Sequence, residues 1–344
     1  MIKVLIIDDS PLIRGLLKEV LQQADDIEVV GSAEDPYQAR EMIKRFNPDV
    51  LTLDVEMPKM DGISFLKNLM RLRPMPVVMI STLTQKGSPI TLEALEIGAV
   101  DFIAKPTQNV VEHIHHYASA VQQKVRIAAK ARVRGFREQS LKPLVELSRA
   151  VFHSNKVLAI GASTGGTEAI KEILIRLPEQ CPPVVITQHI PPVFSTSFAL
   201  RMDRTCTIHV KEAEHGDKLK VGWAFIAPGD QHLTVVKKNN GLYCQLDNGE
   251  LVNRHRPAVD VLFNSLTQAC PKHTVAALLT GMGSDGARGL LALKQAGAYT
   301  LAQDEMSSVV WGMPKAAIEL QAAYEVVRLE QMAEQMLKQA ITPL

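Results

Sequence analysis

The sequence predicts an α/β protein made of two successive sheet-based domains. Short apolar runs alternate with helix-length segments in two separate parts of the chain, which is the pattern of a parallel sheet covered on both faces. The 344 residues exceed one ordinary domain, and 46% of them are hydrophobic, enough for two cores. We therefore expect a doubly wound (βα)5 domain with a five-stranded parallel sheet, a linker, and then an α/β domain with a mainly parallel sheet and an antiparallel hairpin portion.

Five strands are expected in the first domain, residues 1–122, each followed by a helix. The strands fall at 4–7, 28–31, 50–53, 77–80 and 101–104, and the helices at about 11–23, up to 47, 64–72, 90–97 and 110–125. Each apolar run has the length of a buried strand, and the last helix carries one apolar stripe. This half of the chain is therefore expected to fold as one doubly wound unit.

The pattern changes over residues 123–153. Basic residues crowd the start of this segment, Gly135 interrupts it, and Pro143 follows. We interpret it as a linker whose first part continues the preceding helix, and whose charges face solvent.

A second alternating pattern fills residues 154–344. It opens with a strand at 157–160, a glycine-rich turn at 161–166 and a helix, followed by a strand at 184–187. Alternating segments at 223–227, 233–236 and 242–246, separated by turn residues, predict hairpins added to the sheet. A strand at 275–279 then leads into a second glycine-rich turn at 281–286 and another helix.

Charge and hydropathy exclude several classes of protein. The 38 basic and 37 acidic residues give a formal charge of +1, without the basic excess of a nucleic-acid-binding chain, so no nucleic-acid partner is expected. The uncharged stretch of residues 181–200 contains four prolines and cannot form a spanning helix. The N-terminus meets acidic residues too early for a secretory signal, and we expect a cytoplasmic protein.

Acidic residues follow two strands of the first domain. Asp8 and Asp9 come after the first strand and Asp54 after the third, while Ser81 and Lys105 end the fourth and fifth. The carboxyl ends of the strands in a doubly wound sheet share one crevice, so these side chains are expected to meet there. Gathered carboxylates repel one another unless a cation neutralises them, and a hard ion such as Mg²⁺ suits oxygen ligands.

A serine, a histidine and an aspartate follow strands of the second domain. Ser163 lies in a G-x-S-x-G turn between a strand and a helix, a context that exposes a hydroxyl near backbone N–H groups. His189 ends the next strand, and Asp285 lies in the second glycine-rich turn. A nucleophilic serine needs a base, and the base needs an orienting carboxylate. The chain order Ser, His, Asp differs from those of the common serine proteases and α/β-hydrolases.

The residues of the first site resemble the response regulator receiver family over about the first third of the chain. The matching residues are Asp8-Asp9, the stretch 53–62 (LDVEMPKMDG), Ser81 and Lys105-Pro106. The resemblance implies that Asp54 accepts a phosphoryl group from a sensor histidine kinase. It also implies that Asp8, Asp9, Asp54 and the Glu56 carbonyl hold Mg²⁺, and that Ser81 and Lys105 contact the phosphoryl oxygens.

The second site resembles the chemotaxis protein-glutamate methylesterases (CheB-type). The matching segments are 161–166 (GASTGG), 188–192 (QHIPP), 227–229 (APG) with His232, 280–286 (TGMGSDG), 303–305 (QDE) and 310–314 (VWGMP). Together with the receiver, the match covers nearly the whole chain. Ser284 stands where the family commonly has Asn, and Trp311 where it often has Tyr; neither is a proposed catalytic group.

This resemblance implies a hydrolase that removes methyl esters from glutamates of methyl-accepting chemoreceptors, and that also deamidates specific receptor glutamines. Ser163 would attack, His189 would take its proton and Asp285 would orient the imidazolium, with Thr164 and Met282 as the candidate oxyanion support. No cofactor is expected in this domain, and contact with a membrane is expected only through the receptors. A receiver ahead of a hydrolase further suggests that the unphosphorylated receiver covers the active-site edge and that phosphorylation activates the enzyme.

The second domain has two alternative interpretations. Residues 161–166 also look like a dinucleotide-binding turn, but they lack the full G-x-G-x-x-G spacing, and the next strand ends in Gln188-His189 instead of an acid for a ribose. A non-catalytic output, such as a transcription factor or a receptor-binding module, is the second; no helix-turn-helix or basic face supports DNA binding. A binding module would tolerate Ser163→Ala, whereas an esterase would not.

Overall fold

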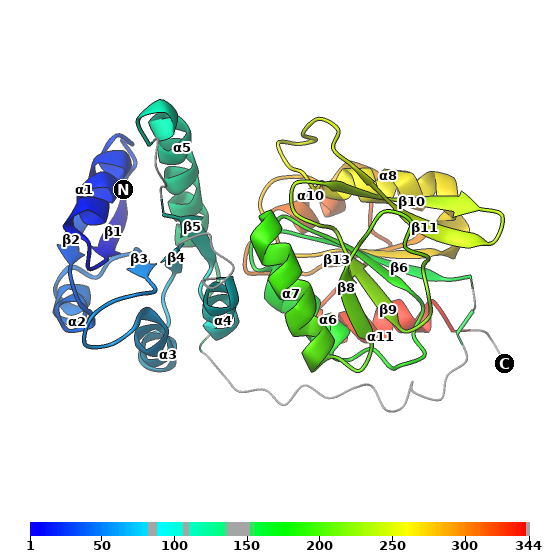
Figure 1. Ribbon diagram of the computed structural model, residues 1–344, viewed down its shortest axis with the longest axis horizontal. Helices are drawn as coiled ribbons and strands as arrows, with labels where there is room; N and C mark the ends of the chain where they lie inside the picture. Colours follow the sequence, from blue (N-terminus) through cyan, green and yellow to red (C-terminus); the bar gives the residue numbers. More distant parts are fainter. Residues whose placement is uncertain (82–87, 106–109, 134, 136–151, 154, 342–344) are drawn as a thin grey trace. The chain divides into compact units, whose positions relative to one another are not determined.

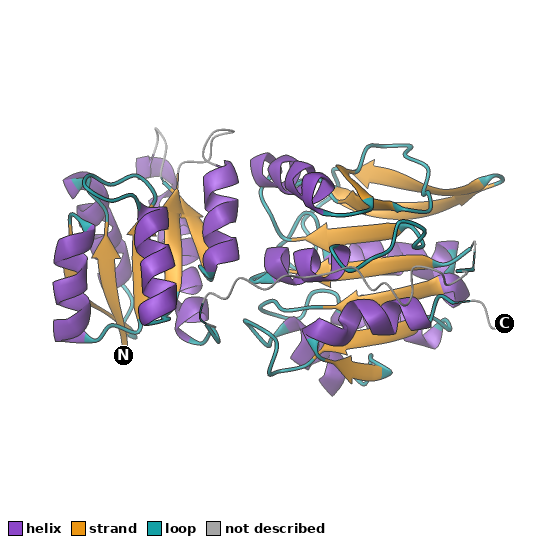
Figure 2. Ribbon diagram, turned by 90° about the horizontal axis from the view of Figure 1, so that it is seen from below, coloured by secondary structure: helices purple, strands orange, loops and turns teal. Residues whose placement is uncertain are grey.

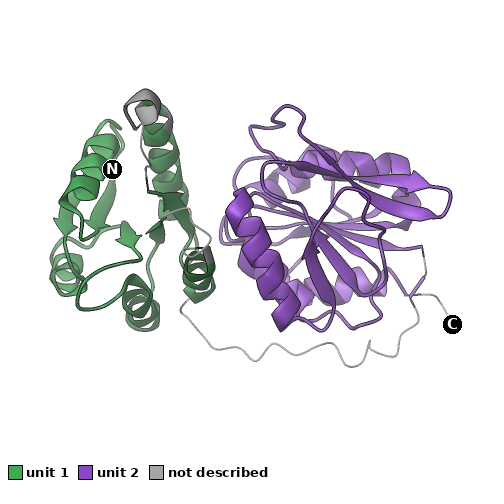
Figure 3. Ribbon diagram, in the orientation of Figure 1, with its two compact units in different colours: residues 1–138 green, residues 139–344 purple. Residues whose placement is uncertain are grey.

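The computed structural model describes residues 1–81, 88–105, 110–133, 135, 152–153 and 155–341. The chain divides into two compact units, residues 1–138 (unit 1) and 139–344 (unit 2) (Figure 3). Of the segment 123–153, expected to be a linker, residues 134 and 136–151 lie outside the described residues. Its beginning continues the last helix of unit 1, which ends at Ala129.

Unit 1 is a five-stranded parallel sheet in the order β2-β1-β3-β4-β5, with helices on both faces (Figures 1 and 2). Its strands are β1 (Ile2–Ile7), β2 (Ile27–Ala33), β3 (Val50–Asp54), β4 (Val77–Ser81) and β5 (Asp101–Ala104). Its helices are α1 (Pro11–Gln22), α2 (Pro36–Phe46), α3 (Gly62–Leu72), α4 (Ser88–Ile97) and α5 (Val110–Ala129). The predicted doubly wound five-stranded sheet is thus confirmed.

Short polar residues fix where the helices of unit 1 begin. The Ser10 side chain accepts from the backbone N–H of Ile13, and Pro11 occupies the first helical position, where its missing N–H costs nothing. The pair Asp35 and Pro36 starts α2 in the same way. Because α1 starts so soon after β1, Asp8 and Asp9 are confined to the tight connection at the carboxyl end of that strand.

Unit 2 contains a seven-stranded sheet in the order β14-β13-β12-β6-β7-β9-β8, in which every neighbouring pair is parallel. Its strands are β6 (Val157–Ala162), β7 (Val184–Gln188), β8 (His209–Glu212), β9 (Trp223–Ile226), β12 (Thr274–Leu278), β13 (Tyr299–Gln303) and β14 (Glu325–Val327). Its helices are α6 (Gly166–Leu174), α7 (Pro192–Thr205), α8 (Val259–Ala269), α9 (Ala287–Gln295), α10 (Met313–Glu319), α11 (Leu329–Lys338) and the 3-10 helix η2 (Pro271–His273). None of the helices that the structure describes has both the length and the apolarity needed to cross a bilayer.

The hairpin portion differs in detail from the expectation. Strands β10 (His232–Lys238) and β11 (Gly241–Asp247) form one antiparallel hairpin, but as a separate two-stranded sheet. Its inner face, including Leu233 and Val235, belongs to the same buried cluster as Leu262 and Leu266 of α8. The segment 223–227, expected to join a hairpin, instead supplies β9 between two parallel neighbours. The alternation of apolar and polar residues along a strand indicates which of its faces is buried, but it does not indicate whether the neighbouring strands are parallel or antiparallel.

Candidate active site

Three adjacent strands carry the serine, histidine and aspartate predicted for the second domain. Strand β6 lies between β12 and β7 in the middle of the sheet of unit 2. Ser163 directly follows β6 and His189 directly follows β7, and the last paired residues of these strands face each other. Asp285 lies in the glycine-rich turn after β12. The parallel arrangement therefore brings all three side chains to one edge of the sheet.

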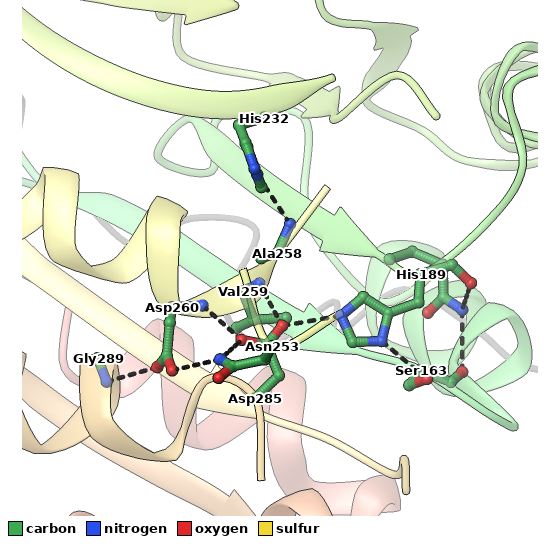
Figure 4. Close-up of polar contacts among 10 residues, drawn as sticks. Ser163, His189, His232, Asn253, Ala258, Val259, Asp260, Asp285 and Gly289 are labelled. Atoms are coloured by element: carbon green, nitrogen blue, oxygen red, sulfur yellow. Dashed lines mark hydrogen bonds and ion pairs between the residues drawn. The ribbon is translucent and has the colours of Figure 1, made fainter. Parts of the chain in front are cut away.

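A continuous chain of hydrogen bonds joins these side chains (Figure 4). His189 Nδ1 lies 3.0 Å from Ser163 Oγ, and His189 Nε2 lies 2.8 Å from Asp285 Oδ2. The carboxylate can only accept, so Nε2 carries the proton and the lone pair of Nδ1 faces the serine hydroxyl. The ring orientation is the reverse of that in the serine proteases, where Nε2 faces the serine. Proton transfer from Ser163 to the ring is geometrically direct.

Asp285 is held as a carboxylate although only 2% of it is exposed. Burial alone would raise its pKa, but the hydrogen bonds and charge of His189, together with donation from Asn253 and Val259, lower the pKa below its usual value. Oδ2 accepts from the Val259 N–H at 2.6 Å, and Oδ1 accepts from Asn253 Nδ2 at 2.7 Å and the Asp260 N–H at 3.2 Å. The negative charge next to the imidazole is therefore stabilised by four donors.

Three residues around this site were not predicted from the sequence as part of it. Asn253 Nδ2 bridges Asp285 Oδ1 and Asp260 Oδ2, the latter at 2.8 Å (Figure 4). Burial raises the pKa of the Asp260 carboxyl. The His255 ring stacks on the His189 ring, with centroids 3.7 Å apart and planes 9° apart. No spacing rule marks these residues, because the contact from Asn253 to Asp285 spans 32 positions.

Two positions of the serine turn, Gly165 and Gly166, have room only for glycine. Gly165 has φ +76°, a left-handed conformation that side chains disfavour, and it caps the start of α6. A Cβ on Gly166 would lie 2.1 Å from Gln188 Oε1 and 2.7 Å from the Ala162 Cβ, so the turn packs tightly against β7. Gln188 Nε2 also donates to the Ser163 carbonyl at 2.9 Å. These contacts fix the backbone that presents the serine.

The two glycine-rich turns touch each other beside Ser163. The Ser163 N–H donates to the Thr280 carbonyl at 3.0 Å, and a Cβ on Gly281 would lie 2.7 Å from the Ser163 Cβ. Thr280 Oγ1 donates to the Thr164 carbonyl at 2.9 Å. Met282, next along the second turn, has an exposed fraction of 43%, so this turn borders solvent at the serine. Both candidate oxyanion residues, Thr164 and Met282, thus belong to turns in direct contact at the nucleophile.

The acidic residues of unit 1 also meet. Carboxylate oxygens of Asp8, Asp9 and Asp54 lie within 4.8 Å of one another at the carboxyl ends of the neighbouring strands β1 and β3. Lys105 Nζ, after β5, lies 2.7 Å from Asp54 Oδ2 and 3.4 Å from Asp8 Oδ2. Ser81 ends β4, where its hydroxyl lies 2.7 Å from Thr91 Oγ1 of α4. The predicted acids, serine and lysine therefore lie at the carboxyl ends of β1, β3, β4 and β5, which are neighbours in the sheet.

The charge balance of this cluster fits a hard cation. Burial raises the pKa of Asp54 to about 6 and raises that of Asp8, in spite of attraction to Lys105. The pKa of Lys105 would be lowered by burial, but the two carboxylates outweigh this and raise it. Among the described residues, the Lys105 ammonium pairs with two of the three carboxylates, and oxygen-rich, under-neutralised clusters of this kind suit Mg²⁺. Glu56 and Asp9 line a common hollow of about 510 Å³, and the Glu56 backbone N–H donates to the Asp54 carboxylate, so the backbone of Glu56 lies beside the same cluster.

Comparisons with known proteins match a family to each of the two units. The family described as CheB methylesterase matches residues 158–336, and the family described as response regulator receiver domain matches residues 4–115. The crystal structure of the Thermotoga maritima CheB methylesterase catalytic domain is similar to unit 2: it is 39% identical, its TM-score is 0.53, and the match covers 54% of this chain and 99% of that one.

Two full-length relatives extend the similarity over both units. A protein of Thiobacillus denitrificans named protein-glutamate methylesterase/protein-glutamine glutaminase is 53% identical over 98% of this chain and 96% of its own length. A protein of the same name from Salmonella typhimurium is 51% identical over 98% of this chain and 96% of its own length. The chain therefore belongs to the CheB methylesterase family, with a response regulator receiver domain preceding the methylesterase domain.

Proposed function

We propose that this enzyme hydrolyses the methyl esters of glutamate side chains on chemoreceptors and deamidates specific receptor glutamines, as part of chemotactic adaptation. The names of its relatives support these substrates. The observation that carries the chemistry is the hydrogen-bonded chain from Ser163 Oγ through His189 to Asp285. A methyl ester and a primary amide are attacked in the same way at the carbonyl carbon, so one site serves both reactions.

In the first half of the reaction, Ser163 Oγ attacks the ester carbonyl while His189 Nδ1 takes the hydroxyl proton. The imidazolium that forms carries its second proton on Nε2 and is stabilised by the Asp285 carboxylate. The two glycine-rich turns border the nucleophile, and we assign the oxyanion to backbone N–H groups at Thr164 and Met282. Losing one oxyanion donor costs about 3 kcal/mol in the activation barrier of comparable hydrolases.

In the second half, the leaving group departs and water attacks the acyl-enzyme. His189 returns its proton to methoxide, which leaves as methanol, or to the amide nitrogen, which leaves as ammonia. The same ring then takes a proton from water and returns it to Ser163 Oγ as the second tetrahedral intermediate collapses, which frees Ser163 and the glutamate side chain. No cofactor enters this cycle, because each proton moves between substrate, water and His189.

The receiver would control this activity through Asp54. We propose that a sensor histidine kinase supplies the phosphoryl group, and that Asp8, Asp9, Asp54 and the Glu56 carbonyl hold Mg²⁺, which would neutralise charge on the phosphoryl oxygens. Lys105, already paired with Asp54, would pair with a phosphoryl oxygen, and Ser81 would donate a hydrogen bond to another. Phosphorylation would then raise esterase activity. The chain would work in the cytoplasm and meet the membrane through its receptor substrates.

Methanol release from membranes bearing radiolabelled methylated chemoreceptors tests this proposal. We expect Ser163→Ala to reduce release at least about 10³-fold, because the nucleophile is lost. A matched hydroxyl deletion is Thr267→Ala on α8, which serves as the control with unchanged release. Its exposed hydroxyl donates to the carbonyl of Asn264 and accepts from Gln268 Nε2, and neither contact involves the triad. Addition of a small-molecule phosphodonor with Mg²⁺ is expected to raise release by the wild type. Full release by Ser163→Ala would overturn the assignment of the nucleophile.

A further inference from the structure

A tight turn between β11 and α8 reaches the candidate triad from outside the three strands that carry it. Val252 and His255 exchange backbone hydrogen bonds, at 3.1 Å from the Val252 N–H and 2.9 Å from the His255 N–H. The two central residues, Asn253 and Arg254, both have positive φ, 51° and 67°, as in a type I′ turn. Arginine disfavours this conformation, so the turn keeps an unfavourable backbone geometry, a feature that concentrates at functional sites.

Asn253 contributes the side-chain donor on the outer oxygen of Asp285. Asp285 Oδ1 accepts from Asn253 Nδ2 at 2.7 Å, while the inner oxygen Oδ2 faces His189. The same amide nitrogen donates to Asp260 Oδ2 at 2.8 Å, and Asp260 Oδ1 accepts from the Gly289 N–H at 2.7 Å. Asn253 thereby holds two neighbouring buried carboxylates in fixed positions, and it neutralises part of the charge that Asp285 would otherwise direct at the imidazole.

His255, at the other end of the turn, covers one face of His189. The two rings are nearly parallel, with centroids 3.7 Å apart. A flat partner at this distance prevents the His189 ring from tilting away from the line between Ser163 Oγ and Asp285 Oδ2. One four-residue turn therefore contacts both groups that activate the serine, through residues two positions apart.

We propose that the turn 252–255 is the positioning element of the triad: Asn253 fixes and partly neutralises Asp285, and His255 fixes the ring of His189. This inference rests on the proposed function, since it assigns the residues that prepare its base. Neither residue touches the substrate; both act through the triad. A purely structural turn would support folding and leave the pH dependence of serine activation unchanged, whereas a positioning turn alters it.

The variant Asn253→Gly isolates the amide, because glycine accepts the positive φ of this position without strain. Its matched control is Asn240→Gly, the same change in the β10–β11 turn, where the side chain accepts from Tyr243 Oη at 2.9 Å. The measurement is the rate at which an alkyl fluorophosphonate labels Ser163 in the full-length protein, followed by mass spectrometry from pH 5 to 9. Ser163→Ala gives the background.

We expect Asn253→Gly to slow labelling roughly 10- to 100-fold, the equivalent of losing one hydrogen bond to a charged group. We also expect the midpoint of its pH profile to rise by about one unit, because an Asp285 with fewer donors favours the protonated imidazole. Asn240→Gly is expected to match the wild type in both. Equal rates and equal midpoints for the two glycine variants would overturn the inference.

A second pair of variants tests the other end of the turn. His255→Phe keeps a flat ring and is expected to label Ser163 within about threefold of the wild type, whereas His255→Ala is expected to be roughly 2- to 10-fold slower, as for loss of one aromatic pair. Equal rates for this pair would refute the role of His255, even where Asn253→Gly fails to fold. Absence of labelling in the wild type would instead count against the proposed function itself.

Discussion

Replacing Asp54 with asparagine is expected to stabilise unit 1 at neutral and alkaline pH. Asp54 is 1% exposed, and burial raises its pKa from 3.8 to about 6 even with Lys105 beside it. A difference of about two pH units corresponds to about 3 kcal/mol between the protonation states. The folded chain binds this proton more tightly than the unfolded chain, so the ionised carboxylate costs stability above pH 6. Asparagine removes that cost.

The pH dependence follows from the same shift. The cost of ionising Asp54 is absent below about pH 4, grows as the pH rises through 6, and is complete at pH 8. The gain of Asp54→Asn is therefore expected to approach about 3 kcal/mol at pH 8 without divalent cations, and to vanish near pH 4. Added Mg²⁺ is expected to stabilise the wild type more than the variant, because the ion offsets the same charge.

Hydrogen exchange measures the expected gain in the stability of unit 1 within the full-length protein. Peptides covering β1 and β3 report the opening of unit 1, while Trp223 and Trp311, the two tryptophans of the chain, report unit 2 by fluorescence and are expected to be unchanged. Asp25→Asn, which removes an exposed carboxylate of the same unit, is the control with little effect. Unchanged protection of β1 and β3 at pH 8, or a gain that persists at pH 4, would refute the reasoning.

Three further changes test the geometry. Asp285→Asn places an amide NH₂ against a backbone N–H whichever way it turns, since Oδ2 accepts from Val259 and Oδ1 from Asp260. We expect methanol release to fall at least about 10²-fold, and we expect the free energy of unfolding, measured by denaturant titration, to fall by about 1–3 kcal/mol. Gly281→Ala would set a Cβ 2.4 Å from Met313 Sδ and 2.7 Å from the Ser163 Cβ, and we expect it to slow fluorophosphonate labelling with little loss of receiver phosphorylation; wild-type labelling would show that the two turns move apart freely. Lys105→Met removes the ammonium that pairs with Asp54, and we expect the activation by phosphodonor to disappear while basal methanol release is kept; intact activation would exclude a role for this ion pair in signalling.

Local pattern was sufficient to predict the two sheets and the residue types at their strand ends. A buried parallel strand is a continuous apolar run, and β1, β3, β6 and β7 are of this kind, so their positions follow from the sequence alone. Once the sheets are parallel, all strands of a sheet end at the same edge. The meeting of Ser163 with His189, and of Asp8 with Asp54, is a consequence of that rule.

The local sequence pattern did not predict whether neighbouring strands pair in parallel or antiparallel. The segment 223–227 has the composition of a hairpin strand, but it fills a place between two parallel neighbours, while β10 and β11 pair with each other against α8. The difference depends on which surfaces remain to be covered after the sheet and α8 have formed. Such packing involves residues far apart in the chain and leaves no period in the sequence.

The sequence by itself determined the fold class, the two domains in order, the acidic cluster and the three residue types of the candidate triad, because each depends on an apolar period and on the residue that follows it. Only the tertiary structure decided which ring nitrogen of His189 faces the serine, that Asn253 bridges Asp285 and Asp260, and that His255 stacks on His189. These contacts come from an irregular turn, whose path is set by the surfaces it lies on. Local propensity fixes the strands, and the packing of the whole unit fixes the site.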